Sequence, residues 1–139
     1  MSVVDDVRRT IALYSQLLDD KRFAEWGDLF TVDAVFEARG TRLVGRDQIV
    51  EWISEVMVSA SSKHLIGACV IDLIGDDRAR AWTDLTTFSA LPDGIAVATV
   101  GRYHDELRRE PDGRWRFAQR IMVRTGDTPP DDVVAPPGA

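Results

Sequence analysis

The sequence contains few of the residues that build metal sites and disulfides. One cysteine, Cys69, and two histidines occur in 139 residues. A single cysteine cannot form a disulfide within the chain, so we expect a reducing compartment, the cytoplasm. His64 and His104 are far apart and have no metal-ligand spacing, and no glycine-rich phosphate loop is present. We therefore expect no metal and no other cofactor.

Basic charge and long apolar runs are also scarce. Lys and Arg number 17 against 23 Asp and Glu, which gives a net charge of −6. Such a chain repels a polyanion, so nucleic acid is not an expected partner. No apolar run approaches the roughly 20 residues of a membrane-spanning helix, and the acidic start MSVVDDVRRT is unlike a signal peptide. We expect no membrane partner.

What the sequence does contain is typical of one globular domain that begins with helices. Hydrophobic residues make up 45% of the chain, with four Trp and five Phe. Ser2 and Asp5 form a helix-start signature, and apolar residues then recur at steps of three or four up to Leu18. This predicts a helix over 3–19. A short second helix around Phe23 and a third over about 46–58 follow the same periodicity.

The second half of the chain has the pattern of β-strands. Residues 62–74, 78–90, 95–108 and 114–124 alternate or are β-branched and aromatic, with turn sequences between them. The segments DAVFEA and TRLVG predict two shorter strands. Helices followed by a strand meander indicate an α+β fold, with the helices packed on one face of a curved, mostly antiparallel sheet. We expect a single domain over 1–125.

Residues 126–139 form a proline-rich C-terminal tail that cannot extend a sheet. Four of the six prolines lie there. Prolines on either side of Val133 and Val134 stiffen the segment, which lowers the entropy cost of ordering it. The tail is either disordered, or it covers a pocket mouth or a neighbouring subunit.

Two polar residues stand where the pattern does not require them. Asp19 follows the last apolar position of the first helix, where the macrodipole disfavours an acid. His64 opens an otherwise apolar strand. If the helix crosses the open side of the sheet, Asp19 could reach His64 and fix its tautomer, which would make a general base. Alternatively, His64 is a satisfied or exposed strand residue. His104, beside two acids, is interpreted as a solvated edge residue.

Strand alternation gives each long strand two faces. In the first long strand it places His64 on the same side as Ile66, Ala68 and Val70. In the last strand it separates two sets, neither of which is clean enough to assign to the core: Trp115, Phe117, Gln119 and Ile121, and Arg116, Ala118, Arg120 and Met122.

Several motifs resemble one known family when they are taken in order. They are Y-x4-D at Tyr14 and Asp19, LF-x2-DA over 29–34, GR-x2-I over 45–49, H-x-I over 64–66 and DG-x-W-x-F-x2-R over 112–120. Residues 3–124 thereby resemble the SnoaL-like branch of the nuclear transport factor two-like superfamily, which includes relatives such as scytalone dehydratase and lindane dehydrochlorinase. The resemblance implies a cone-shaped α+β barrel around a deep apolar pocket.

The resemblance also implies roles for individual residues. Asp19 and His64 match a proton-abstracting pair of the dehydratase and the dehydrochlorinase, and Arg120 matches an arginine of the latter. Arg120, with Tyr14 or Asp84, is expected to stabilise a leaving group or a developing anion. The residues assigned to the substrate pocket are Tyr14, Trp26, Phe36, Trp82, Asp84 and Phe88.

The sequence departs from other members of the superfamily at their reactive positions. The second histidine of scytalone dehydratase falls near Gly101 and Arg102 here. The Arg-x-Asp of limonene epoxide hydrolase keeps only Asp84. The base of ketosteroid isomerase falls near Ala38. These departures leave the Asp19 and His64 pair as the main chemical signal.

The preferred hypothesis is a dehydratase-like lyase or isomerase without a cofactor, acting on a small, apolar, cyclic substrate. Two alternatives remain: a polyketide cyclase or epoxide hydrolase-like enzyme with Asp84 as the acid, and a non-catalytic ligand-binding or dimer-adaptor module. A contact between Asp19 and His64 inside a cavity would favour an enzyme. Apolar residues on the outer sheet face predict a homodimer or homotrimer.

Overall fold

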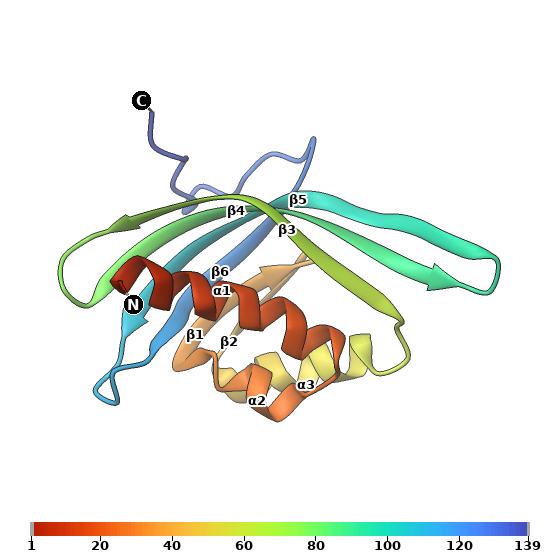
Figure 1. Ribbon diagram of the computed structural model, residues 1–139, viewed down its shortest axis with the longest axis horizontal. Coiled ribbons are helices and arrows are strands. Elements are labelled where there is room, and N and C mark those ends of the chain that lie inside the picture. The colour runs from red at the N-terminus through yellow and green to blue at the C-terminus, as the bar shows by residue number, and fades with distance from the viewer. Residues whose placement is uncertain (1, 139) are drawn as a thin grey trace.

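The computed structural model describes residues 2–138 as three helices and six strands in one α+β unit (Figure 1). The helices are α1 (Val3–Asp19), α2 (Phe23–Gly27) and α3 (Arg46–Met57). The strands are β1 (Phe30–Ala38), β2 (Thr41–Val44), β3 (Ser62–Leu73), β4 (Arg78–Leu91), β5 (Gly94–Arg109) and β6 (Trp115–Arg124). The predicted α+β class and the order of helices before long strands are confirmed.

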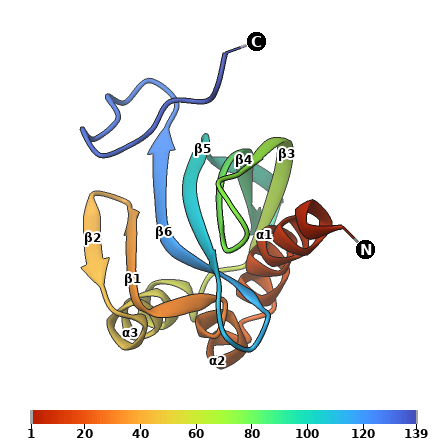
Figure 2. The same ribbon diagram turned by 90° about the vertical axis from the view of Figure 1, so that its left-hand side faces the viewer.

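All six strands belong to one curved sheet in the order β2-β1-β6-β5-β4-β3. Only the β1–β6 pair is parallel, as expected for a mostly antiparallel sheet. Helix α1 crosses the concave side, where it contacts β3 and β6, while α3 contacts β1 and β2 (Figures 1 and 2). The sheet stays unclosed, because β2 and β3 are edge strands, so "barrel" describes its curvature and not a closed ring of strands.

The start of α1 follows from its first residues. The Ser2 side chain accepts from the Asp5 N–H, and the Asp5 side chain accepts from the Ser2 N–H, which makes a capping box. One face of α1, from Val7 to Leu18, is buried against the sheet. The helix ends at Asp19, and Lys21 then adopts a left-handed conformation with φ of 58° that turns the chain towards α2.

The buried space between helices and sheet is filled largely by aromatic rings. Tyr14 packs against four other buried aromatic residues, with ring centroids 5.3 to 6.2 Å away: Trp26, Phe30, Tyr103 and Phe117. Because these rings come from α1, α2, β1, β5 and β6, they tie the helices to the sheet. They also hold the ring of Tyr14 in place, about one and a half helical turns before Asp19.

Alternation along β3 holds only for its first half. The pairing of β3 with β4 shifts between Ile66 and Cys69, so a bulge reverses which side chains face inward. Cys69 and Ile71 pack on the core, whereas Val70 is 45% exposed. The predicted common face for His64, Ile66, Ala68 and Val70 is therefore wrong beyond Ile66.

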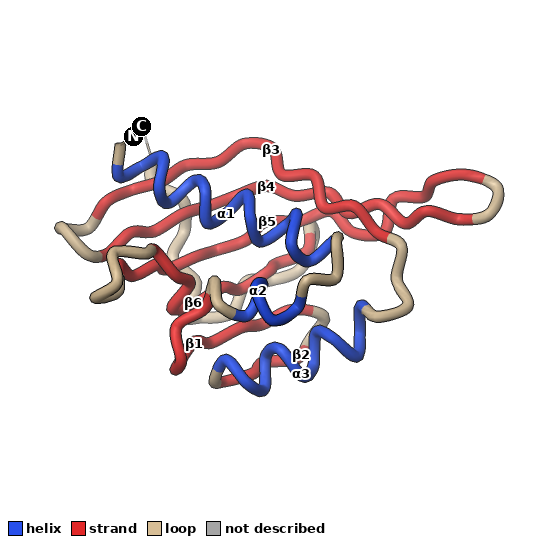
Figure 3. Tube along the Cα trace, turned by 60° about the horizontal axis from the view of Figure 1, so that its bottom comes forward, coloured by secondary structure: helices blue, strands red, loops and turns tan. Residues whose placement is uncertain are grey.

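The tail lies on the outer, convex side of the sheet, opposite α1 (Figure 1). Arg42 of β2 donates to both carboxylate oxygens of Asp132, at 2.8 and 3.0 Å. The indole Nε1–H of Trp82 donates to the Val134 carbonyl at 2.8 Å. These contacts hold the segment against its own sheet. Figure 3, which looks onto the helical side, shows α1 and α2 with no tail across them.

Candidate active site

Asp19 and His64 form a buried pair at the junction of α1 and β3. The Nδ1 atom of His64 lies 2.5 Å from Asp19 Oδ1, and the backbone N–H of His64 donates to Asp19 Oδ2 at 2.9 Å. The side chain of His64 is 10% exposed and that of Asp19 is 5% exposed. Both carboxylate oxygens of Asp19, the last residue of α1, thus accept hydrogen bonds from His64 near the start of β3. These bonds account for an acidic residue at the end of the helix.

This geometry determines which ring nitrogen of His64 is free. An ionised carboxylate only accepts hydrogen bonds, so Nδ1 carries the proton that points to Asp19. The other nitrogen, Nε2, then keeps its lone pair, and within residues 2–138 it has no hydrogen-bond partner. A histidine held in this tautomer by a carboxylate is suited to accept a proton at Nε2.

His64 lines a cavity of about 100 Å³ between α1, α3 and the inner face of the sheet. Its walls are mostly apolar and include Tyr14, Phe36, Trp52, Leu85 and Met122. Hydroxyl groups also line it, from Ser62, Thr87, Ser89 and Thr99. Ligand pockets for drug-sized molecules measure about 300–1,000 Å³. A cavity of this size therefore suits one small ring.

Arg120 lies outside this lining. Its guanidinium is fully buried and donates to both oxygens of Asp105, at 2.7 and 2.9 Å. The guanidinium carbon lies 3.7 Å from the ring centroid of Tyr103 and 4.2 Å from those of Tyr14 and Phe117. The expected contact between Arg120 and a substrate is not provided by this arrangement, because aromatic rings surround the cation.

Tyr103 lines the cavity and was missed at the level of sequence. It lies on β5 next to Tyr14, at 5.4 Å between ring centroids. Burial raises the pKa of both phenols, and the positive charge of Arg120 opposes that rise. Both tyrosines therefore stay protonated near neutral pH and can donate hydrogen bonds. Alternation from the buried Asp105 would have placed Tyr103 on the inner face.

The residues assigned to the substrate pocket lie in three different parts of the structure. Tyr14 and Phe36 line the cavity with His64. Trp26 is completely buried in the aromatic core behind it. The assignments of Trp82, Asp84 and Phe88 to this pocket are wrong, because none of the three lines it: Trp82 bonds to the tail, and Asp84 and Phe88 line a groove on the outer face.

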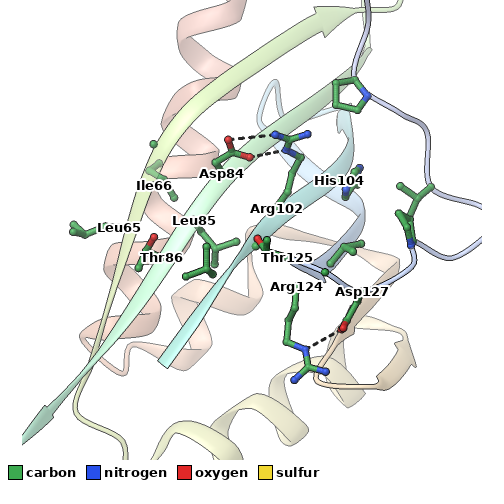
Figure 4. Close-up of a pocket in the computed structure, with 18 of the residues that line it drawn as sticks. Leu65, Ile66, Asp84, Leu85, Thr86, Arg102, His104, Arg124, Thr125 and Asp127 are labelled. Atoms are coloured by element: carbon green, nitrogen blue, oxygen red, sulfur yellow. Dashed lines mark hydrogen bonds and ion pairs between the residues drawn. The ribbon is translucent and has the colours of Figure 1, made fainter. Parts of the chain in front are cut away.

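The groove on the outer face is larger, about 680 Å³, and lies between β3–β6 and the tail (Figure 4). Its charges are matched in pairs, Asp84 with Arg102 and Arg124 with Asp127. His104 also lines it and is near the Val134 carbonyl at 3.4 Å. The expected solvated edge position is wrong, because His104 is partly buried on β5, which pairs with both β4 and β6. Burial also lowers the His104 pKa. Among residues 2–138, no carboxylate orients a histidine in this groove, because the acceptor near His104 Nδ1 is a backbone carbonyl.

Comparison with known proteins agrees with this architecture. The SnoaL-like domain model matches residues 1–121. The chain belongs to the SnoaL-like domain family. No helix within residues 2–138 has the length and apolarity to cross a membrane.

Individual known proteins are similar to this chain over most of their length. An uncharacterised protein of Mycobacterium tuberculosis is 26% identical over 125 residues, which cover 86% of this chain and 83% of the relative. A Catenulispora acidiphila structure in complex with S-DNPA is 27% identical, with a TM-score of 0.79, over 88% of this chain and 92% of that one. A candidate scytalone dehydratase of Novosphingobium aromaticivorans, 21% identical over 88% and 83% with a TM-score of 0.77, shares the fold.

Proposed function

We propose that this SnoaL-like protein is a dehydratase-like lyase or isomerase that works without a cofactor. It removes a proton from carbon in a small, mostly apolar, cyclic substrate. The observation that supports this most strongly is the 2.5 Å contact between Asp19 and His64 beside an apolar cavity. A non-catalytic adaptor would not need a buried base in this orientation.

The reaction begins when Nε2 of His64 accepts the proton of a substrate C–H group. The C–H bond breaks, and its electron pair forms a double bond to the neighbouring carbon. In a dehydration, that carbon loses hydroxide, which takes the proton from His64 and leaves as water. In an isomerisation, the new double bond displaces an existing one of the substrate, and the displaced electron pair takes the proton back from His64 at a different carbon. Asp19 remains ionised and stabilises the transient imidazolium, in the way that a carboxylate orients a catalytic histidine.

Tyr14 and Tyr103 supply hydrogen-bond donors for the negative charge that develops on the substrate. Both hydroxyls belong to residues that line the cavity, and apolar surroundings strengthen such bonds. Arg120 acts through them as a positioning residue, because its charge lies directly against both rings. Asp105 in turn holds Arg120 in place.

The placement of Asp84 bears on the alternative reactions. Asp84 is bonded to Arg102 on the outer face, so it does not share a cavity with His64 and does not serve as its acid. This argues against an epoxide hydrolase reaction. A cyclase reaction needs only a base and an anion-stabilising group, and it remains the second candidate because the same cavity supplies both.

Proton abstraction can be tested before any product has been identified. Cyclic ketones, hydroxy ketones and halo compounds, each with one ring, are incubated with the protein in D₂O, and NMR detects loss of a C–H signal. We expect exchange or elimination for at least one compound, and none with His64→Ala. A panel in which wild type and His64→Ala never differ would count against the proposal.

We also expect a homodimer or homotrimer that buries the outer sheet face. Leu65, Val70 and Val100 are 45–52% exposed there. The paired charges of the groove leave this face locally neutral although the chain carries −6, so two copies can approach without strong repulsion. Val100→Glu should shift the light-scattering mass towards the monomer. Val32→Glu, at a 72% exposed residue outside the groove, should not. A monomeric wild type at micromolar concentration would contradict this expectation.

A further inference from the structure

The mouth of the His64 cavity carries one cation that no acidic group of the protein neutralises. Arg39 lines the cavity and is exposed. Among residues 2–138 it is the one Lys or Arg in the lining, and no Asp or Glu lines the cavity. No hydrogen bond or ion pair to Arg39 exists within the described part of the chain. Its charge is therefore available to a ligand.

The acidic residue closest to Arg39 along the hairpin is paired with another arginine. Glu37, two residues earlier, accepts from Arg42 Nε at 2.7 Å. Arg42 also binds both oxygens of Asp132 in the tail. The hairpin thus uses one arginine to fasten the tail and leaves the other one free beside the cavity.

The backbone at Arg39 gives a second, independent observation. Arg39 and Gly40 are the two central residues of the β1–β2 turn, with φ of 55° and 73°. A two-residue turn with positive φ at both positions favours Asn-Gly or Asp-Gly, and a longer L-residue in the left-handed region is unfavourable. Such strained residues cluster at functional sites, where another requirement holds them. An arginine here is suboptimal for the turn and places a charge at the cavity mouth.

We infer that Arg39 selects substrates with a carboxylate. The inference rests on the proposed function and narrows its substrate class to a small ring, held against Phe36 and Trp52, with a carboxylate at the cavity mouth. The guanidinium pairs with that carboxylate through two parallel N–H donors. A substrate bound in this way is oriented with its ring towards His64.

Benzoate and its neutral isostere benzamide test the inference by binding alone. Isothermal titration, with NMR shifts of the cavity residues as a second readout, gives both affinities. We expect wild type to prefer benzoate by about fivefold to tenfold, with a preference that decreases in high salt. Arg39→Gln should abolish the preference and leave benzamide binding unchanged, while Arg39→Lys should keep part of it. Arg9→Gln, at an exposed arginine on α1, is the matched control.

A turn variant separates the role of the charge from the role of the fold. Arg39→Asn suits the left-handed position better, so it should raise the melting temperature by about 1–3 °C while it loses the benzoate preference. A drop in melting temperature together with lost binding of both compounds would indicate a structural role for Arg39 and overturn the inference.

Three further binding results would contradict the role proposed for Arg39. Equal affinity of wild type for the two compounds, a preference that survives in Arg39→Gln, or no binding of either one at millimolar concentration would overturn it. The result is independent of catalysis, because His64→Ala should show the same preference for benzoate. Preserved preference without any proton abstraction would therefore reject the proposed reaction and leave the role of Arg39 standing.

Discussion

His64→Ala and Asp19→Asn should each slow proton abstraction by a factor of about 10² to 10⁴, the range that a general base contributes. The double variant should be hardly slower than the slower single variant, because the two residues act as one unit. Initial rates of C–H exchange or product formation measure the effect. Losses that multiply in the double variant would show that the residues act separately.

The chemistry of an amide explains why Asp19→Asn is a severe change. Two donors of His64, the ring Nδ1–H and the backbone N–H, converge on the two oxygens of Asp19. Asparagine offers one oxygen and one NH₂ group, so one of these donors is left facing another donor. Asp20→Asn is a matched control, since Asp20 is the exposed residue next along the chain, and His104→Ala controls for the loss of a histidine. Both should keep near wild-type rates.

Arg120→Met should lower the free energy of unfolding by about 3–5 kcal/mol, because it leaves the Asp105 carboxylate buried without its partner. Burial already raises the Asp105 pKa, and Arg120 is the main opposing influence. Urea unfolding followed by tryptophan fluorescence measures the loss. The control is Arg124→Met, which removes an exposed pair with Asp127 and should cost less than about 1 kcal/mol.

A second variant distinguishes loss of the ion pair from loss of packing. Arg120→Met combined with Asp105→Leu removes both charges together, so it should recover much of the stability lost by Arg120→Met alone. If the free energy of unfolding of the combined variant is instead lower than that of Arg120→Met, by the full cost of a second cavity, then Arg120 stabilises the fold by packing and not by its ion pair.

Local signals along the chain were sufficient to predict most of the helices and strands. The Ser2 and Asp5 cap, the helical periodicity to Leu18 and the turn sequences between strands each depend on neighbours within a few residues. The contact between Asp19 and His64 could be anticipated for a related reason. An acid at a helix end and a histidine at a strand start are both unusual locally, and one long-range contact explains both.

The faces of the strands could not be predicted in the same way. A bulge after Ile66 in β3 and another irregularity between Thr87 and Phe88 in the β4–β5 pairing each reverse the alternation. Both depend on the curvature of the whole sheet. Along β4 itself the alternation is regular, with Ala81, Leu85 and Thr87 buried, but the sequence does not show which of its two faces points inward, and Phe88 and Asp84 were assigned to the wrong one. Arg120 was misplaced for another reason, since an arginine is rarely buried and its partner Asp105 comes from a different strand.

The tail illustrates a further limit of sequence patterns. Its prolines indicated an extended segment, and the paired valines suggested a plug over a pocket mouth. In the structure, Asp132 and Val134 attach it to β2 and β4 on the outer face, away from the His64 cavity. Which face a stiff segment covers depends on where the chain leaves the last strand, and alternation alone does not determine that position.

The tautomer of His64 is the property on which the proposed chemistry depends most directly, and it can be measured without any substrate. Long-range ¹H–¹⁵N NMR of the neutral imidazole should show a protonated Nδ1 with a strongly downfield proton and an unprotonated Nε2. Asp19→Asn should shift or abolish that downfield signal. A neutral His64 protonated at Nε2, or a ring whose signals are unchanged in Asp19→Asn, would contradict the assignment of His64 as a base held by Asp19.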